Sequence, residues 1–141
     1  MNERELLENW GAQKVSQNFR RLRSSTLAEF EFIRQSCRSS YSFVKFLAEP
    51  ADELSLVFEV EWPAAFDETY TRRIKNAVAE AVLDALWLVK DPYRGCRLRL
   101  IEFKWDAIGS NEVAVHQATL LAMNVLIADG DWVEVTGRYR P

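Results

Sequence analysis

A stretch near the middle of the chain in which every second residue is apolar constrains its fold most. Single residues, two of them glutamates, separate five apolar side chains in this stretch: Leu54, Leu56, Phe58, Val60 and Trp62. Because successive side chains of a strand point to opposite faces of a sheet, the spacing predicts a strand with one buried face and one face in water. Other parts of the chain must therefore cover one side of a sheet.

Two later segments have the helical spacing needed to supply this cover. Pro63 ends the strand, Asp67 is placed to cap the first helix, and Ser110 is placed to cap the second, which ends near residue 128. The apolar positions are Ile74, Val78, Ala81, Val82, Ala85 and Leu86 in the first helix, and Val113, Ala114, Ala118, Leu121, Ala122 and Val125 in the second. Alanines at positions 77, 79, 81 and 85 keep one face of the first helix slim, as a helix that lies close to a sheet requires.

Four more segments have strand-like patterns: residues 27–35, 41–48, 96–105 and 132–136. In the third of these the apolar phase slips after Leu100, which predicts a β-bulge there. Three consecutive strands, followed by helices that alternate with single strands, predict an α+β domain. We expect a mostly antiparallel sheet with the helices on one face.

The N-terminal residues 3–23 have an amphipathic helical pattern, which Ser24-Ser25-Thr26 breaks. We therefore divide the chain into an N-terminal helix and linker, residues 1–26, and a domain, residues 27–141. The helix could pack on the domain, remain loosely attached, or dock on a protein partner or a second copy. Its docking residues would come from the apolar stripe, which includes Leu7, Trp10, Phe19 and Leu22.

Composition limits the classes of partner. A net charge of -3 and a pI of about 5.3 give no overall basic surface, so any nucleic-acid contact must use one of three local basic clusters, at residues 20–23, 34–38 and 72–75. The acidic N-terminus has no apolar signal region, and no apolar run is long enough to span a bilayer. We therefore expect a cytoplasmic protein without membrane contact, in which Cys37 and Cys96 are free thiols.

The sequence contains no recognisable catalytic, metal-binding or nucleotide-binding motif. His116 is the one histidine and has no nucleophile or orienting acid at a known motif spacing. Two distant cysteines do not have zinc-ligand spacing, and five dispersed glycines form no phosphate-binding loop. We therefore expect no enzymatic activity, cofactor, metal or bound nucleotide.

Several short stretches, taken in order, carry a family resemblance. They are Ala28-Glu29-Phe30-Glu31-Phe32-Ile33-Arg34-Gln35, Arg38-Ser39-Ser40-Tyr41, Ala48-Glu49-Pro50, Ala77-Val78-Ala79-Glu80-Ala81, the strand opened by Gly95, and Gly109-Ser110-Asn111-Glu112-Val113-Ala114. With this order and spacing, the chain from Leu27 to Ala128 resembles domain IV of the translational GTPases of the elongation factor G class and of the ribosomal protection proteins of tetracycline resistance, here as a stand-alone domain.

The resemblance implies a four-stranded sheet backed by two helices, with a left-handed β-α-β crossover and distal loops that reach the decoding region of the small ribosomal subunit. The tip residues carried over are Arg38, Ser39, Ser40 and Tyr41 in one loop and Asp106, Ala107, Ile108, Gly109 and Ser110 in the other. Asp106 stands where elongation factors have a histidine, and the usual glycine-rich first loop is replaced by Ser-Cys-Arg-Ser-Ser.

Two functions follow as expectations. The first is a non-catalytic domain that binds the ribosome or structured RNA through its distal loops, with the Tyr41 ring stacking on a base and Arg38 meeting a phosphate. The alternative is a protein-interaction or self-assembly module that has lost RNA binding and docks through its N-terminal helix. An unrecognised enzyme on the same scaffold is a third, less supported, interpretation.

Overall fold

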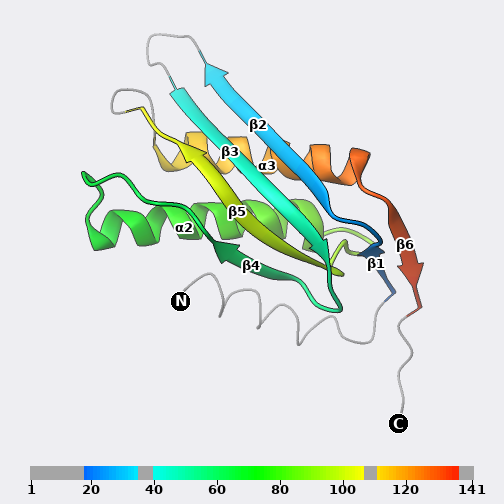
Figure 1. Cartoon of the computed structure of the whole chain (residues 1–141). Coiled ribbons are helices and arrows are strands. Elements are labelled where there is room, and N and C mark those ends of the chain that lie inside the picture. Colours follow the sequence, from blue (N-terminus) through cyan, green and yellow to red (C-terminus); the bar gives the residue numbers. More distant parts are fainter. Residues whose placement is uncertain (1–17, 35–39, 107–110, 137–141) are drawn as a thin grey trace.

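A computed structural model of the chain describes residues 18–34, 40–106 and 111–136. In this part of the chain, six strands and two long helices form a two-layer arrangement (Figure 1). The predicted α+β class is confirmed. Neither helix is both long and apolar enough to cross a lipid bilayer, within the same residues.

The larger sheet has four strands in the order β2-β3-β5-β4. They are β2 (Thr26–Arg34), β3 (Ser40–Pro50), β4 (Ser55–Phe58) and β5 (Cys96–Lys104). β3 is antiparallel to both β2 and β5, whereas β4 is parallel to β5. Helices α2 (Glu68–Val82) and α3 (Glu112–Asp129) both lie behind the sheet in the view of Figure 1, which leaves the other face without a described helix.

The core fills the space between this sheet and the two helices. Strand residues such as Phe46 and Leu98 are fully buried there, as are Ile74 and Val78 of α2 and Ala118 of α3. Ala77, Ala79 and Ala81 of α2 are buried and allow this helix to pack closely on the strands, as predicted. In α3, Val113, which the spacing assigned to the apolar face, is instead 70% exposed.

The alternating stretch at residues 54–62 forms a shorter strand than predicted. Leu54 and Leu56 are buried against the helices, but β4 ends at Phe58. Trp62 continues the apolar pattern without belonging to the sheet, because its ring packs against Phe58 and Phe103, with centroids 5.9 and 5.3 Å away. An alternating pattern can therefore outlast the strand when an aromatic cluster follows.

The helix starts agree with the sequence at one position and differ at the other. Asp67 caps α2 as predicted, since its Oδ1 accepts a hydrogen bond from the Tyr70 backbone N–H at 2.7 Å. The cap of α3 is Asn111, not Ser110, because Asn111 Oδ1 accepts from the Ala114 N–H at 2.8 Å. Serine and asparagine cap helices equally well, so the sequence alone could not separate the two positions.

Two local irregularities shape these elements. Lys45 faces Glu102, whereas the next residue, Phe46, faces Leu100, so Ile101 is the extra residue of a β-bulge. This confirms the bulge predicted near Leu100. α2 continues into a π-helical turn, η1 (Leu83–Trp87), which the sequence did not predict.

The end of the predicted N-terminal helix is instead a strand. β1 (Phe19–Leu22) runs antiparallel to β6 (Trp132–Val135), the predicted last strand, and Arg21 also bridges to Gly95. Backbone hydrogen bonds from both sides favour the extended form over a helix.

The predicted division at residue 26 is therefore wrong for these residues. Leu22 is fully buried in the core of the domain, so β1 belongs to it. Leu7 and Trp10, the other proposed docking residues of this segment, lie outside the described residues.

Candidate nucleic-acid interface at the distal end of the sheet

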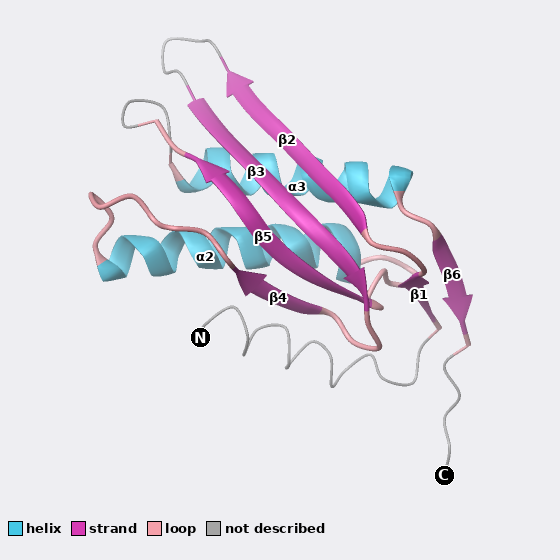
Figure 2. Cartoon of the chain, viewed as in Figure 1, coloured by secondary structure: helices cyan, strands magenta, loops and turns pink. Residues whose placement is uncertain are grey.

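The strand register gathers the flanks of both predicted tip loops at one end of the sheet. Ile33 of β2 pairs with Tyr41 of β3, and Phe43 of β3 pairs with Lys104 of β5. These strand ends lie together at the end of the molecule opposite β1 and β6 (Figure 2). We call this region the distal end.

The structure places only part of the predicted tip. Tyr41 lies at the start of β3, directly after Ser40, and Asp106 follows the end of β5. Six of the predicted tip residues lie outside the described residues: Arg38, Ser39, Ala107, Ile108, Gly109 and Ser110.

Tyr41 links the two loop flanks electrostatically. Its hydroxyl donates a hydrogen bond to Glu31 Oε2 at 3.1 Å. Partial burial raises the pKa of Tyr41 first, and the hydrogen bond to Glu31 and the negative charges of Glu31 and Asp106 raise the pKa further. The two flanks therefore lie close enough for the Asp106 charge to act on Tyr41, whose ring stays neutral near pH 7.

The described residues of the distal end carry charges of both signs. Lys104 Nζ lies 4.8 Å from the centre of the Phe43 ring and 3.9 Å from Glu102 Oε1, and Arg34 is exposed at the end of β2. Glu31, Glu102 and Asp106 offset these cations. The described part of the distal end can stack on a planar group but offers a phosphate little net attraction.

A cluster of aromatic rings supports the segment that leads into the second loop. The Phe66 ring packs edge-on against Trp105 at 4.9 Å and against Tyr70 of α2 at 4.7 Å, and Trp62 stacks on Phe66 at 6.3 Å. Such contacts fix the end of β5 against the start of α2. Sequence reasoning missed this role, although aromatic residues concentrated on both sides of Asp67 and before Asp106 are a visible signal.

The basic cluster at residues 20–23 serves the domain itself. The Arg20 guanidinium lies 4.6 Å from the centre of the Tyr93 ring, while Arg21 and Arg23 form ion pairs with Asp52 and Asp131 at 3.2 and 3.6 Å. On α2, Arg72 and Arg73 form ion pairs with Glu68 and Glu112. Of the three clusters, the one at residues 34–38 is therefore the one that begins at the distal end.

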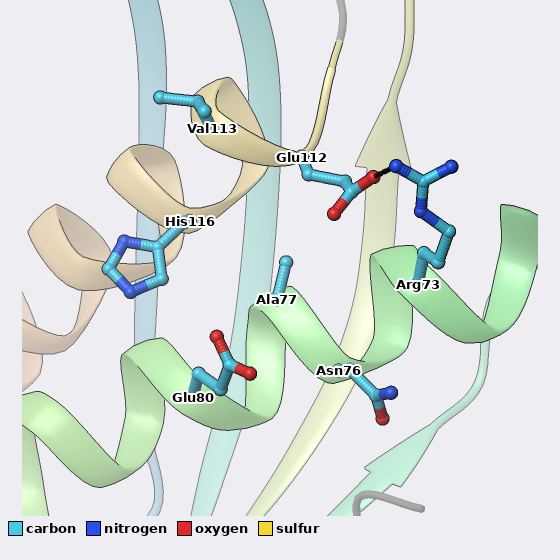
Figure 3. A pocket seen from close by; sticks show the side chains of 7 residues that line it. All are labelled: Arg73, Asn76, Ala77, Glu80, Glu112, Val113 and His116. Atoms are coloured by element: carbon cyan, nitrogen blue, oxygen red, sulfur yellow. Dashed lines mark ion pairs between the residues drawn. The ribbon is translucent and has the colours of Figure 1, made fainter.

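A separate groove of about 400 Å³ lies between α2 and α3 (Figure 3). It is lined by Arg73, Asn76, Ala77, Glu80, Glu112, Val113 and His116. The Arg73–Glu112 ion pair joins its two sides, and His116 Nε2 lies 3.3 Å from Asp84 Oδ2. The lining contains no serine, threonine or cysteine that the imidazole could activate. Across the described ranges, no group of three or more His, Cys, Asp or Glu side chains is placed to hold a metal ion.

Cys96 has the environment of an inert thiol. It is completely buried at the start of β5, and desolvation raises its pKa to about 12. The thiolate, which is the reactive form, is therefore scarce at physiological pH. Cys37 lies outside the described residues.

Comparison with known proteins shows the fold and no family. The sequence matches no protein-family model and no curated protein. The crystal structure of ttk003000868 from Thermus thermophilus is similar, with a TM-score of 0.67 and 18% sequence identity over 84% of this chain. The match covers 18% of that protein, so this chain corresponds to less than a fifth of its length. Identity at this level indicates a shared fold alone.

Proposed function

We propose that this chain is a non-catalytic binding domain, similar to the fourth domain of translocation factors, that contacts the ribosome or structured RNA through its distal loops. The observation that carries the proposal is the convergence of both loop flanks at one end of the sheet, where the Asp106 charge acts on Tyr41. Two loops whose flanks lie side by side can contact one RNA surface together.

The path of the chain supports the kinship to translation factors. β4 and β5 are parallel neighbours joined through α2. In the view of Figure 1 the chain passes behind the sheet in α2 and returns in β5. This path agrees with the left-handed crossover that the resemblance implies, a connection that is rare among proteins. The similar fold of the Thermus thermophilus structure agrees with this kinship without establishing it.

The chemistry of the distal end favours recognition by shape and stacking over binding by charge. Tyr41 offers a neutral ring at pH 7, and Arg38, three positions earlier in the sequence, is the basic residue of the first loop. Asp106 repels phosphate, and the chain as a whole has a net charge of -3. We therefore expect binding to structured ribosomal RNA with only a few phosphate contacts, and little binding to arbitrary nucleic acid.

Co-sedimentation with purified small ribosomal subunits tests the proposal. The wild-type chain should bind, and with two or three phosphate contacts the plot of log affinity against log salt should have a slope of about -2. Both Arg38→Glu and Tyr41→Ala should weaken binding, since one removes a phosphate contact and the other a stacking surface worth about 1–3 kcal/mol.

Arg72→Glu is the matched control. It makes the same charge change as Arg38→Glu at an exposed position on α2, outside both predicted tip loops. Binding that responds equally to Arg38→Glu and Arg72→Glu would show a general charge effect. Unchanged binding in Arg38→Glu and Tyr41→Ala would remove the distal loops from the interface.

The alternative, assembly through an N-terminal helix, loses part of its basis. Leu22 is buried in this domain, and the Arg94 guanidinium stacks on the Phe19 ring at 3.7 Å. Neither Leu22 nor Phe19 is therefore presented on a helix for a partner. Leu7 and Trp10, the other proposed docking residues, lie outside the described residues, so docking through them stays a prediction.

A further inference from the structure

β2 forms one edge of the larger sheet, and no described strand lies on its outer side. It is nine residues long, and among the described residues it pairs with β3 alone. Figure 1 shows it as the outermost strand on its side of the sheet, with α3 behind it. A long edge strand presents unpaired backbone N–H and C=O groups, which can bind another extended chain.

The outward side chains of this edge form a symmetric pattern. Leu27 and Ile33 are 54% and 58% exposed, the largest values for apolar side chains of the sheet. Glu29 and Glu31 lie between them on the same face, because side chains alternate along a strand and Ala28 is buried on the opposite face. The pattern on the open face is therefore apolar, acidic, acidic, apolar.

This charge pattern opposes pairing of β2 with a second copy of itself. An antiparallel pair centred on Phe30 would place Glu29 of each copy opposite Glu31 of the other. Shifting the antiparallel pairing by two residues keeps the same side chains on the open face. In one direction the shift places Glu29 opposite Glu29 of the other copy, and in the other direction Glu31 opposite Glu31. Like charges directly opposite one another destabilise a strand pair, so each of these central registers is disfavoured.

We propose that the β2 edge binds an extended segment of a partner protein that carries apolar, basic, basic and apolar residues at alternate positions. The segment adds as a fifth strand beside β2. Its lysines or arginines lie opposite Glu29 and Glu31, and its apolar residues cover Leu27 and Ile33. Tyr41 already donates to Glu31 Oε2, but a carboxylate accepts several hydrogen bonds, so Glu31 can also take a partner cation.

Synthetic peptides test this specificity on the wild-type chain. The probe is acetyl-Thr-Val-Thr-Lys-Thr-Lys-Thr-Val-Thr-amide, compared with the same peptide carrying glutamate in place of lysine and with an isomer whose two lysines are adjacent. Affinity measured by NMR titration should be at least tenfold higher for the probe than for either control peptide. Hydrogen exchange of the amides of residues 26–34 should slow when the probe binds. Equal affinities, no binding, or shifts confined to another surface would overturn the proposal.

Charge reversal provides the matched variant. Glu29→Lys together with Glu31→Lys should reverse the order, so that the glutamate peptide binds at least tenfold better than the lysine peptide. A folded double variant that keeps the wild-type preference would place the peptide elsewhere.

A single substitution tests the edge without any peptide. Glu29→Lys makes β2 complementary to itself, because in the register centred on Phe30 each new lysine faces Glu31 of the other copy. Sedimentation equilibrium should detect dimers of this variant at concentrations where the wild type is monomeric. A wild-type dimer that pairs through β2 would make a second copy the occupant and overturn the proposal, as would a Glu29→Lys variant that remains monomeric.

Discussion

Replacing Gly95 with alanine tests the structural finding that the sequence predicted least well, the strand at residues 19–22. Gly95 lies directly beside β1. A Cβ atom at this position would be 2.6 Å from the Cα and 2.6 Å from the Cβ of Arg21. Because one of these atoms is backbone, no side-chain rotation can relieve the overlap, and β1 or the Gly95 segment must shift.

The expected loss of stability follows from these contacts. The Leu22 N–H donates to the Gly95 carbonyl and the Gly95 N–H donates to the Arg20 carbonyl, each at 3.0 Å. Overpacking costs about 1–3 kcal/mol and a weakened backbone hydrogen bond about 1 kcal/mol, so we expect Gly95→Ala to lower the free energy of unfolding by about 2–4 kcal/mol. That is a large fraction of the total stability of a typical domain, about 5–15 kcal/mol.

Urea unfolding followed by tryptophan fluorescence measures this change. Lys90→Ala is the control, since Lys90 is exposed in the same connection and its replacement should change stability by less than about 0.5 kcal/mol. If residues 19–22 were the end of a helix away from Gly95, Gly95→Ala would behave like the control. A loss below about 0.5 kcal/mol would therefore refute the placement of β1.

Other predictions concern single groups. In a Cys37→Ser variant, Cys96 should react with a disulfide reagent at pH 8 only as fast as the protein unfolds, because burial raises the pKa of Cys96 to about 12. Rapid stoichiometric labelling would contradict the burial of Cys96. The pKa of Tyr41 should exceed 10.0, and it should be lower in the Asp106→Asn variant. Titrations of the absorbance at 295 nm measure this pKa from the difference between the wild type and Tyr41→Phe. The folded state holds the Tyr41 proton more tightly than the unfolded state does. The Tyr41 contribution to stability is therefore complete below pH 10 and is lost as the pH rises through the higher folded-state pKa. A Tyr41→Phe variant that loses the same stability at alkaline pH would argue against this contribution. Asn111→Ala should lower the free energy of unfolding by about 1 kcal/mol while Asn111→Asp should not, and equal losses would show that the Ala114 N–H does not depend on this cap.

The parts of the fold that the sequence predicted are those with one dominant signal. The Asp67 cap, the phase slip after Leu100 and the alanine-rich face of α2 each correspond to a single structural cause, and each appears in the structure. Phe19 and Leu22 carried no such signal. Their spacing of three fits a helix, and residues far away in sequence decide that this segment is a strand. Backbone pairing with β6 and Gly95, which lie far away in sequence, overrides this local helical pattern.

The candidate site was predictable in its position and not in its chemistry. Tyr41 and Asp106 lie at the ends of predicted strands, so strand order alone suggests that they are neighbours. The hydrogen bond from Tyr41 to Glu31 depends on the register of β2 against β3, which the sequence does not specify. The exposed edge of β2 likewise required the strand order, because a sequence pattern does not distinguish an edge strand from a central one.

Competition on the small ribosomal subunit tests most directly whether the distal loops bind where a translocation factor does. Increasing amounts of the wild-type chain should displace labelled elongation factor G from ribosomes, and Arg38→Glu should displace it much less than Arg72→Glu does. Simultaneous binding of both proteins, with neither affecting the affinity of the other, would contradict a shared site.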